Sequence, residues 1–554
     1  MKKCFLTGIL FFIVCCTLFL GRVYAQAGHD VSPLSLIPLL SGSFGELRAT
    51  HFHTGIDLKT GGRVGLPVRC VSDGLVSRIS VSATGYGNAL YIDHPDGTTT
   101  VYGHLQRYNK KIEEIVRRLQ YEKESFAVDE NVCGCRLFFK KGDTVAFSGN
   151  SGSSGGPHLH FEYRDTRTEK VINPLTRITV KDNIAPRIQT LYLYSISSQG
   201  KVRLIKKNLL KAPAGNLYTA GNIVVPAGTT GVGIFVTDAM NDSGSKLGIY
   251  KMGLSASGKE LFRMVVDSCD FALAKVVNDL KDYDLYRNAN ETVYCCFGNF
   301  VELLPGVIAV DKGYIRIGEG EHIPVKMFAE DRNGNRSELS FTLQGGAFPE
   351  VDKSPGLLWD KSYVFDVPPY YLELPAGSLL FSVDSVVRTE TYRDMNGNNY
   401  SVFVAAVPEV PLKTEVCLRI SGPYNTTSVI CRLTDKKKWE ALPTFMDNSG
   451  LYCNVSILGK FAVLSDTISP VIEYAGVIGV RPTFRIRDNL SGIASYRGEV
   501  NGKWCLFEYD AKTGTLSCSK NEPAFVKNRT NKLKMLVKDR AGNTTERNVT
   551  VDIL

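Results

Sequence analysis

Histidine is concentrated at one end of this chain. Seven of its eight histidines precede residue 161, and five of those seven fall in three short motifs. The motifs are His51-Phe-His53-Thr-Gly-Ile-Asp57, Tyr102-Gly-His104-Leu105 and His158-Leu-His160. Imidazole is the commonest protein ligand for zinc and the commonest general base near neutral pH. If these histidines act together, the fold must bring the three motifs close to one another. We therefore expect the first 160 residues to form a metal site.

The bulk composition indicates a globular protein of several domains. Of the 554 residues, 44% are hydrophobic and 22% are charged. A chain of this length is expected to hold three or four domains. The formal net charge of +9 is mild, and Lys2, Lys3 and Arg22 belong to a segment that we expect to be removed. This balance would not repel an anionic polymer, but it does not indicate nucleic acid binding.

Residues 1–25 have the pattern of a secretory signal peptide. Lys2 and Lys3 form a basic start, an apolar run extends from Cys4 to Gly21, and Val23 and Ala25 supply small residues before a cleavage site. We therefore expect export to the periplasm or cell envelope, or secretion. The membrane would be touched only through this segment before cleavage. A retained membrane anchor is the alternative, because the apolar run is about long enough to span a bilayer.

The cysteines do not form a disulfide framework. Three of the fourteen lie in the N-terminal apolar run, and the eleven that remain are odd in number and scattered. Cys505 and Cys518, or Cys417 and Cys431, could pair across neighbouring strands. Cys133-Gly-Cys135 offers a soft metal site, but an isolated pair of this spacing is weak, and buried or loosely paired thiols are favoured.

The predicted fold class is mainly β. Residues 26–180 are rich in glycine and in short alternating runs, such as Ala89 to Asp93 and Thr99 to Tyr102, which predict an antiparallel β-domain. From Asn109 to Glu124 the apolar residues have helical spacing, which predicts a helical insertion between two strands. About three β-sandwich modules are expected to follow this domain.

A loose internal repeat defines the modules. Three pairs of stretches resemble each other: Asp182 to Pro186 and Asp466 to Pro470, Thr237 to Gly244 and Arg487 to Gly492, and Asp331 to Asn335 and Asp539 to Asn543. They predict immunoglobulin-like sandwiches at 181–345 and 466–554, with a further β-rich module at 346–465. The Asp-rich turns could bind calcium, but their oxygen ligands are sparse, so a structural turn is favoured.

A hydrolytic zinc site needs three protein ligands and an open position. His53 and Asp57 are four residues apart, and Gly55 between them allows the chain to turn both onto one metal. His158 and His160 lie two apart on an expected strand, so both face one cleft, and one can bind metal while the other holds the attacking water. Glu162 continues on that face and could accept a hydrogen bond from a ligand imidazole. His104, on another strand, could supply the remaining polar group.

These residues resemble the lysostaphin-type (LytM-like) zinc metalloendopeptidases, which cut peptide bonds in bacterial peptidoglycan. The matching stretches are Ser41 to Arg48, His53 to Asp57, Gly65 to Val68, Asp73 to Val76, Gly85 to Asn88, Tyr91 to His94, Val101 to Leu105, Lys141 to Asp143, Ser148 to Glu162 and Asn173-Pro174. They cover about residues 36–180, less than a third of the chain. The resemblance implies a zinc peptidase domain at 26–180 with the duplicated-hybrid-motif fold of that family.

The resemblance also implies the role of each site residue. His53, Asp57 and His160 would bind one Zn²⁺ per catalytic domain, and His104 and His158 would be the catalytic imidazoles that activate water and stabilise the oxyanion. His51 competes with His53, but only His53 has the required offset to Asp57. His94 is expected to be structural, and His29 and His322 to be surface residues.

The expected function is that of an exported zinc endopeptidase that hydrolyses peptidoglycan cross-links or stem peptides. The alternative is a catalytically silent protein that binds peptidoglycan and activates another hydrolase; silent relatives lose ligands, whereas all five positions are filled here. An adhesin that uses its β-modules is a third interpretation. The modules themselves could position the enzyme, bind an envelope protein or recognise glycan. The insertion near 109–135 could narrow or cover the groove.

Overall fold

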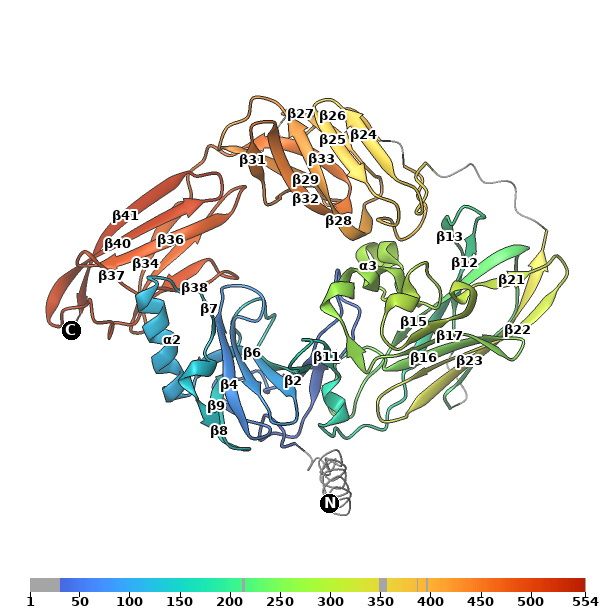
Figure 1. The fold of residues 1–554 in the computed structure, drawn as a ribbon, viewed down its shortest axis with the longest axis horizontal. Helices are drawn as coiled ribbons and strands as arrows, with labels where there is room; N and C mark the ends of the chain where they lie inside the picture. The colour runs from blue at the N-terminus through green and yellow to red at the C-terminus, as the bar shows by residue number, and fades with distance from the viewer. Residues whose placement is uncertain (1–29, 212–214, 348–355, 386, 395–396, 554) are drawn as a thin grey trace, which may run out of the picture.

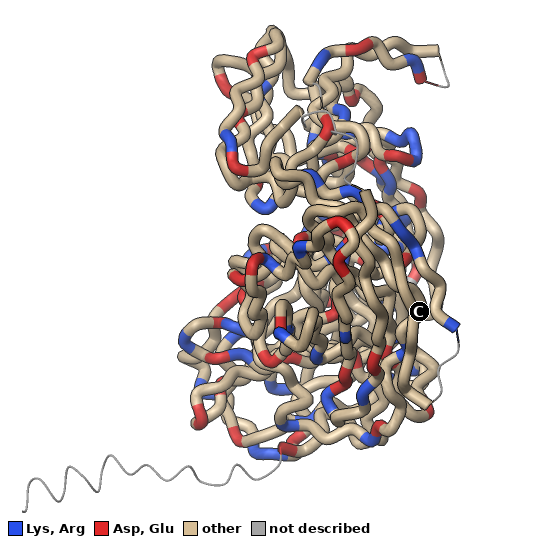
Figure 2. Tube along the Cα trace, turned by 90° about the vertical axis from the view of Figure 1, so that its right-hand side faces the viewer, with Lys and Arg blue, Asp and Glu red and all other residues tan. Residues whose placement is uncertain are grey.

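Four β-rich bodies follow one another along the chain and are arranged as a ring (Figure 1). The computed structural model describes residues 30–211, 215–347, 356–385, 387–394 and 397–553, so the expected signal peptide lies outside the described residues. The prediction of a mainly β, largely antiparallel protein is confirmed. Basic and acidic positions are interspersed along the traced chain (Figure 2), in keeping with the mild net charge.

The first body is built on one large sheet with the order β1-β2-β10-β6-β5-β4-β7. Its strands are β1 (Leu40–Gly42), β2 (Ile56–Lys59), β3 (Pro67–Arg69), β4 (Gly74–Val81), β5 (Asn88–Asp93), β6 (Thr98–Tyr108), β7 (Val128–Asn131), β8 (Phe138–Phe139), β9 (Thr144–Ser148), β10 (His158–Asp165) and β11 (Val171–Ile172). Strand β10 lies between β2 and β6, which places three of the histidine motifs side by side.

Helix α2 (Lys110–Glu122) is the predicted insertion, between β6 and β7. Asn109 caps its start, because its side chain accepts a hydrogen bond from the Lys111 backbone N–H. Ile112 and Val116 are buried and belong to the core of the first body. The opposite side of the helix is left for another contact.

The second body is a sandwich of two sheets. Its strands are β12 (Arg187–Ile196), β13 (Val202–Leu209), β14 (Leu217–Pro226), β15 (Gly228–Thr237), β16 (Lys251–Ala256), β17 (Lys259–Val265), β19 (Val293–Cys295), β20 (Val307–Ala309), β21 (Ile315–Ile317), β22 (His322–Glu330) and β23 (Arg336–Gly346). One sheet has the order β13-β12-β15-β19 with β21 beside β15, and the other has the order β14-β23-β22-β16-β17-β20. Strands β14 and β23 run parallel, while the other pairs are antiparallel. Helix α3 (Tyr283–Ala289) and the 3₁₀ helices η3 (Phe271–Asp279), η4 (Val301–Leu303) and η5 (Val310–Gly313) connect the strands.

The first two bodies share structure across their boundary. Strand β18 (Ser268–Cys269) of the second body pairs with β11 and so extends the sheet of the first. One hydrophobic core runs without a break from residues of the first body, such as Leu40, to residues of the second, such as Leu247. Gly45, with φ of 76°, comes so close to Val266 that a Cβ would lie 2.2 Å from its Cγ1. The two bodies therefore form one packed unit.

The third and fourth bodies are also two-sheet sandwiches with their own cores. The third contains β24 (Tyr363–Val367), β25 (Tyr370–Leu374), β26 (Arg388–Arg393), β27 (Asn399–Val404), β28 (Val410–Ser421), β29 (Ser428–Leu433), β30 (Trp439–Ala441), β31 (Phe445–Asp447), β32 (Gly450–Leu458) and β33 (Lys460–Ser465). The fourth contains β34 (Val471–Ile478), β35 (Arg481–Arg487), β36 (Ile493–Val500), β37 (Lys503–Trp504), β38 (Glu508–Asp510), β39 (Thr515–Ser517), β40 (Arg529–Asp539) and β41 (Thr544–Ile553).

The fourth body closes the ring by contacting helix α2 (Figure 1). Arg117 donates two hydrogen bonds to the carboxylate of Glu522, at 3.0 and 2.9 Å. The Tyr121 hydroxyl donates to the same carboxylate, and its ring meets the Trp504 ring edge-on at 4.9 Å. The predicted helix thus serves as the docking surface for the last body.

Two further properties bear on the sequence predictions. Within the described ranges, no helix combines the length and the apolar character that crossing a bilayer requires. The eleven cysteines that the structure describes are all free thiols.

Candidate metal centre and cleft

The register of three strands assembles the site. In the antiparallel pair β10–β2, His160 lies opposite Asp57, and in the pair β10–β6, His160 lies opposite Gly103, next to His104. His158, two residues before His160, points to the same face, as the strand period predicts. Three segments that are far apart in the sequence therefore meet on one side of the sheet.

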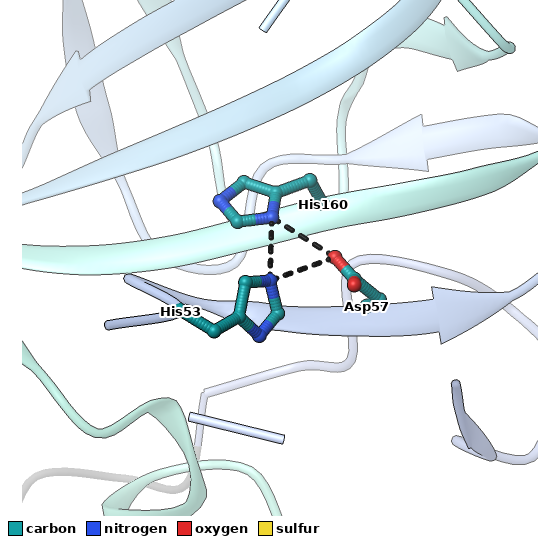
Figure 3. Close-up of side chains that lie close together, drawn as sticks. All are labelled: His53, Asp57 and His160. Atoms are coloured by element: carbon teal, nitrogen blue, oxygen red, sulfur yellow. Dashed lines mark hydrogen bonds and ion pairs between the residues drawn. The ribbon is translucent and has the colours of Figure 1, made fainter. Parts of the chain in front are cut away.

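His53, Asp57 and His160 form a compact triangle (Figure 3). His53 Nε2 lies 3.1 Å from Asp57 Oδ1 and 3.2 Å from His160 Nδ1, and His160 Nδ1 lies 2.9 Å from Asp57 Oδ1. All three side chains are largely shielded from solvent. The structure thus brings together the three predicted ligands.

The outer hydrogen bonds of the two imidazoles fix which nitrogen faces inward as an acceptor. His53 Nδ1 is 2.7 Å from the Ser43 carbonyl oxygen, and His160 Nε2 is 2.9 Å from Glu162 Oε1. A carbonyl and a carboxylate can only accept, so these nitrogens carry the protons. The inward nitrogens and Asp57 Oδ1 are then three electron-pair donors in contact, an arrangement that a cation stabilises.

The triangle fits a tetrahedral zinc ion. Ligand atoms about 2.1 Å from a tetrahedral zinc lie roughly 3.4 Å from one another, close to the separations found here. Two imidazoles and one carboxylate are a hydrolytic donor set that leaves the fourth position free. The donors present therefore suit Zn²⁺.

The titration of the ligands is consistent with a cation between them. Burial would raise the pKa of Asp57, but His53, His158 and His160 hold it far below its usual range. Burial would lower the pKa of His160, yet hydrogen bonds to Asp57 and Glu162 raise it to about 9. The surroundings of His160 thus favour a positive charge next to Asp57.

His104 and His158 stand beside the triangle with their own nitrogens oriented. His104 Nδ1 donates to the Ser151 carbonyl at 2.9 Å, and His158 Nδ1 donates to the Gly156 carbonyl at 2.8 Å. The two rings are 4.8 Å apart, and His158 Nε2 is 3.4 Å from Asp57 Oδ1. Each imidazole therefore keeps Nε2 for the space next to the ligands.

The backbone and the electrostatics of His104 are unusual. Its φ is 57°, in the left-handed region that non-glycine residues adopt uncommonly. Burial, together with His160 and His158, lowers the pKa of His104 to about 4. The imidazole is therefore neutral near pH 7 and can accept a proton at Nε2.

Glu162 is fully buried behind His160. Its carboxylate also accepts hydrogen bonds from Tyr86 and Thr54 and pairs with Arg164 at 2.7 Å. His160, Arg164 and Thr54 hold the pKa of Glu162 down to about 2 against the effect of burial. The charged carboxylate thus fixes the ring of His160. Tyr86 and Thr54 were not singled out from the sequence, although both lie in stretches that carry the family resemblance.

The other early histidines stand apart from the triangle. His51 is exposed at the rim of the cleft, and its Nδ1 lies 3.4 Å from the Thr50 hydroxyl. His94 is buried, with Nδ1 on the Asp73 carbonyl and Nε2 on the Thr100 hydroxyl. His322 is an exposed residue on β22, and His29 lies outside the described residues.

The site opens into a cleft of about 650 Å³ that two bodies line. The first body contributes Arg48, His51, Tyr86 and the five site residues, and the second contributes Cys269, Asp270, Phe271 and Ala274 from β18 and η3. None of the described residues between 109 and 135 lines the cleft, so the insertion does not cover it. The part of the cleft wall that η3 forms lies more than a hundred residues beyond the last histidine motif. No local sequence pattern predicted it.

Comparison with known proteins identifies the first body. Residues 51–121, which include His53, Asp57 and His104, match peptidase family M23. The chain contains an M23 peptidase domain. The family resemblance seen in the motifs is thereby confirmed for this part of the chain.

Several named proteins share the M23 domain. The DD-carboxypeptidase/endopeptidase Mpg of Neisseria meningitidis serogroup B is 32% identical over 150 residues, which are 26% of this chain and 28% of that protein. Lysostaphin of Staphylococcus staphylolyticus is 27% identical over 131 residues, which are 24% of this chain and 21% of that protein. The chain thus spans less than a third of the length of these relatives. Among solved structures, the catalytic domain of the M23 protein EnpA from Enterococcus faecalis is 28% identical, with a TM-score of 0.19; the match covers 27% of this chain and 95% of that one.

Proposed function

We propose that this protein is an exported, zinc-dependent endopeptidase that hydrolyses peptide bonds of peptidoglycan in the periplasm, the cell envelope or the surroundings of the cell. The observation that carries the proposal is the triangle of His53, Asp57 and His160 with two further imidazoles, those of His104 and His158, beside it. Relatives of the M23 domain named as a DD-carboxypeptidase/endopeptidase and as a peptidoglycan DD-endopeptidase support the substrate class.

The division of labour follows from the hydrogen bonds. Zinc, when bound, would polarise the scissile carbonyl and lower the pKa of a bound water to roughly 7. His104 and His158 present Nε2 to the cleft because their Nδ1 protons are held on backbone carbonyls. Such an imidazole takes the proton of the attacking water and, once protonated, donates to the oxygen that becomes negative. Arg48 also lines the cleft, where it pairs with Glu46 at 2.7 Å and with Asp57 at 3.7 Å.

Digestion of purified muropeptides, followed by mass spectrometry of the products, tests the proposal. We expect cleavage by the zinc-loaded protein and, after removal of zinc, none. His160→Ala and Asp57→Ala should lose zinc, whereas His158→Ala and His104→Ala should keep it and lose about 10²- to 10⁴-fold in rate. His51→Ala, an exposed histidine in the same cleft, is the matched control and should keep both properties.

Two outcomes would contradict the proposal. Equal loss of zinc from all four site variants would remove the distinction between ligands and catalytic imidazoles. A panel of muropeptides left intact by the zinc-bound protein would favour the catalytically silent activator instead.

A further inference from the structure

Two clusters of aspartates lie outside the M23 site. One comprises Asp182, Asp238 and Asp331 in the second body, and the other comprises Asp466, Asp488 and Asp539 in the fourth. In each cluster, one carboxylate oxygen from each residue lies within 4.8 Å of the other two. One Asp-rich turn alone has too few oxygen ligands to bind a cation. The fold adds carboxylate oxygens from segments that are distant in the sequence.

The two clusters have the same construction. In the second body, Asn335 donates from its side chain to Asp331 Oδ2 and to the Asp182 backbone carbonyl, at 2.6 and 3.3 Å. In the fourth body, Asn543 donates to Asp539 Oδ2 and to the Asp466 backbone carbonyl, both at 2.8 Å. The internal repeat of the sequence therefore reproduces one arrangement of carboxylates twice.

Buried oxygens in both clusters lack a partner. Asp238 is 5% exposed and Asp466 is fully buried. Among the residues that the structure describes, Asp238 Oδ1, Asp466 Oδ1 and Asp488 Oδ1 accept no hydrogen bond. The ion pairs of the described residues include none of the six aspartates. A buried carboxylate oxygen without a donor is costly unless a cation meets it.

The donors select the kind of cation. Calcium binds oxygens at about 2.4 Å, so carboxylate oxygens that lie within 4.8 Å of one another can share one such ion. Carboxylate and carbonyl ligands suit hard cations, whereas zinc prefers imidazole and thiolate. Mg²⁺ demands a stricter octahedron and keeps several waters, so calcium is the better match.

We propose that each aspartate cluster binds one calcium ion, so that the chain carries two Ca²⁺ sites independent of the M23 centre. Both clusters stand at joints between bodies. The first adjoins a cavity of about 30 Å³ that Leu40 and Ser43 of the M23 domain help to line. Beside the second, the Asp466 backbone N–H donates to the Thr427 carbonyl of the third body at 2.8 Å. Calcium would therefore fasten the second body to the first and the fourth to the third.

Equilibrium dialysis of the purified chain against CaCl₂ tests the proposal. We expect two bound calcium ions per chain, with affinities of about 10⁻⁴ to 10⁻³ M, as in extracellular modules. The single variants Asp238→Asn and Asp488→Asn should each bind one calcium ion per chain, and the double variant should bind none. Asp366→Asn, an exposed aspartate on β24, is the matched control and should leave both.

Folding is checked on the same samples. Circular dichroism without calcium should give the same spectrum for every variant, and calcium should raise the unfolding temperature of the wild type but not that of the double variant. If Asp238→Asn does not fold, Asp182→Asn, which is only half-buried, tests the same cluster. A folded wild type that binds no calcium, folded variants that keep both ions, or equal affinity for Mg²⁺ would overturn the proposal.

Discussion

Arg117 and Glu522 form a two-pronged ion pair between positions 405 residues apart in the sequence. The Glu522 side chain is only 3% exposed, whereas that of Arg117 is 39% exposed. The pair therefore anchors a buried carboxylate of the fourth body to the surface of helix α2.

Arg117→Ala should open the ring. Removing one partner of a buried pair costs about 3–5 kcal/mol, but Arg117 is partly solvated and Tyr121 still donates, so about 1–3 kcal/mol of docking is expected to be lost. Small-angle X-ray scattering should record a larger radius of gyration. Arg118→Ala, which removes an exposed pair with Glu122 on the same helix, is the control. Identical scattering from the two variants would show that this contact does not hold the ring closed.

Phe271→Ala should weaken substrate binding. Phe271 lies on the cleft wall that the second body supplies, with 44% of its surface exposed, and its ring packs against Arg164 at 4.9 Å. We expect the KM for a muropeptide to rise several-fold while kcat and the zinc content stay the same. Ile308→Ala, an exposed apolar residue of the same body that does not line the cleft, is the matched control. An unchanged KM would exclude η3 from the substrate site.

Glu162→Gln should reduce zinc affinity about 10- to 100-fold, because the carboxylate that orients His160 becomes a neutral amide. Competition with a chromogenic chelator measures the change. Glu169→Gln is the control, since Glu169 contacts the same Arg164 from the exposed side. Thermal unfolding without zinc separates this effect from the loss of the buried pair with Arg164. Equal affinities in the two variants would contradict the positioning role.

Asp279 should make the stability of the second body depend on pH. Burial raises the pKa of Asp279 to about 7, although the backbone N–H groups of residues 299–301 lower it. The folded state then holds a proton that the unfolded state has released, so stability falls as pH rises from about 4 to about 7, by roughly 4 kcal/mol at most. Asp279→Asn should flatten this dependence in denaturant titrations at pH 5 and pH 8. The exposed variant Asp366→Asn should keep the wild-type slope.

Much of the M23 domain was predictable, because its site residues lie in short sequence motifs with characteristic spacing. The offset between His53 and Asp57 and the strand period of His158 and His160 predict which side chains converge, and the helical spacing after Asn109 predicts α2. The register that sets His160 opposite Asp57 was not predictable in this way, since it depends on how distant strands pair.

The contacts between bodies escaped sequence reasoning for a related reason. The wall formed by Phe271, the docking of Glu522 and the gathering of Asp182, Asp238 and Asp331 each join segments separated by at least about fifty residues. The periodicity of hydrophobic residues along the sequence does not predict contacts between such distant segments. The sequence favoured a structural role for the Asp-rich turns because each single turn holds few oxygen ligands. In the fold, three separate segments bring their aspartates together, so each cluster holds more oxygens than any one turn.

The pairing of β11 with β18 has a consequence for the smallest piece of this protein that can stand alone. A chain cut at residue 180 would leave the β11 edge bare and strip the cover from a shared core, and bare strand edges promote aggregation. The autonomous catalytic fragment should therefore extend to about residue 346, the end of β23. A gene rearrangement that transferred the peptidase domain to another protein would also have to transfer the adjacent β-sandwich, which is the second body.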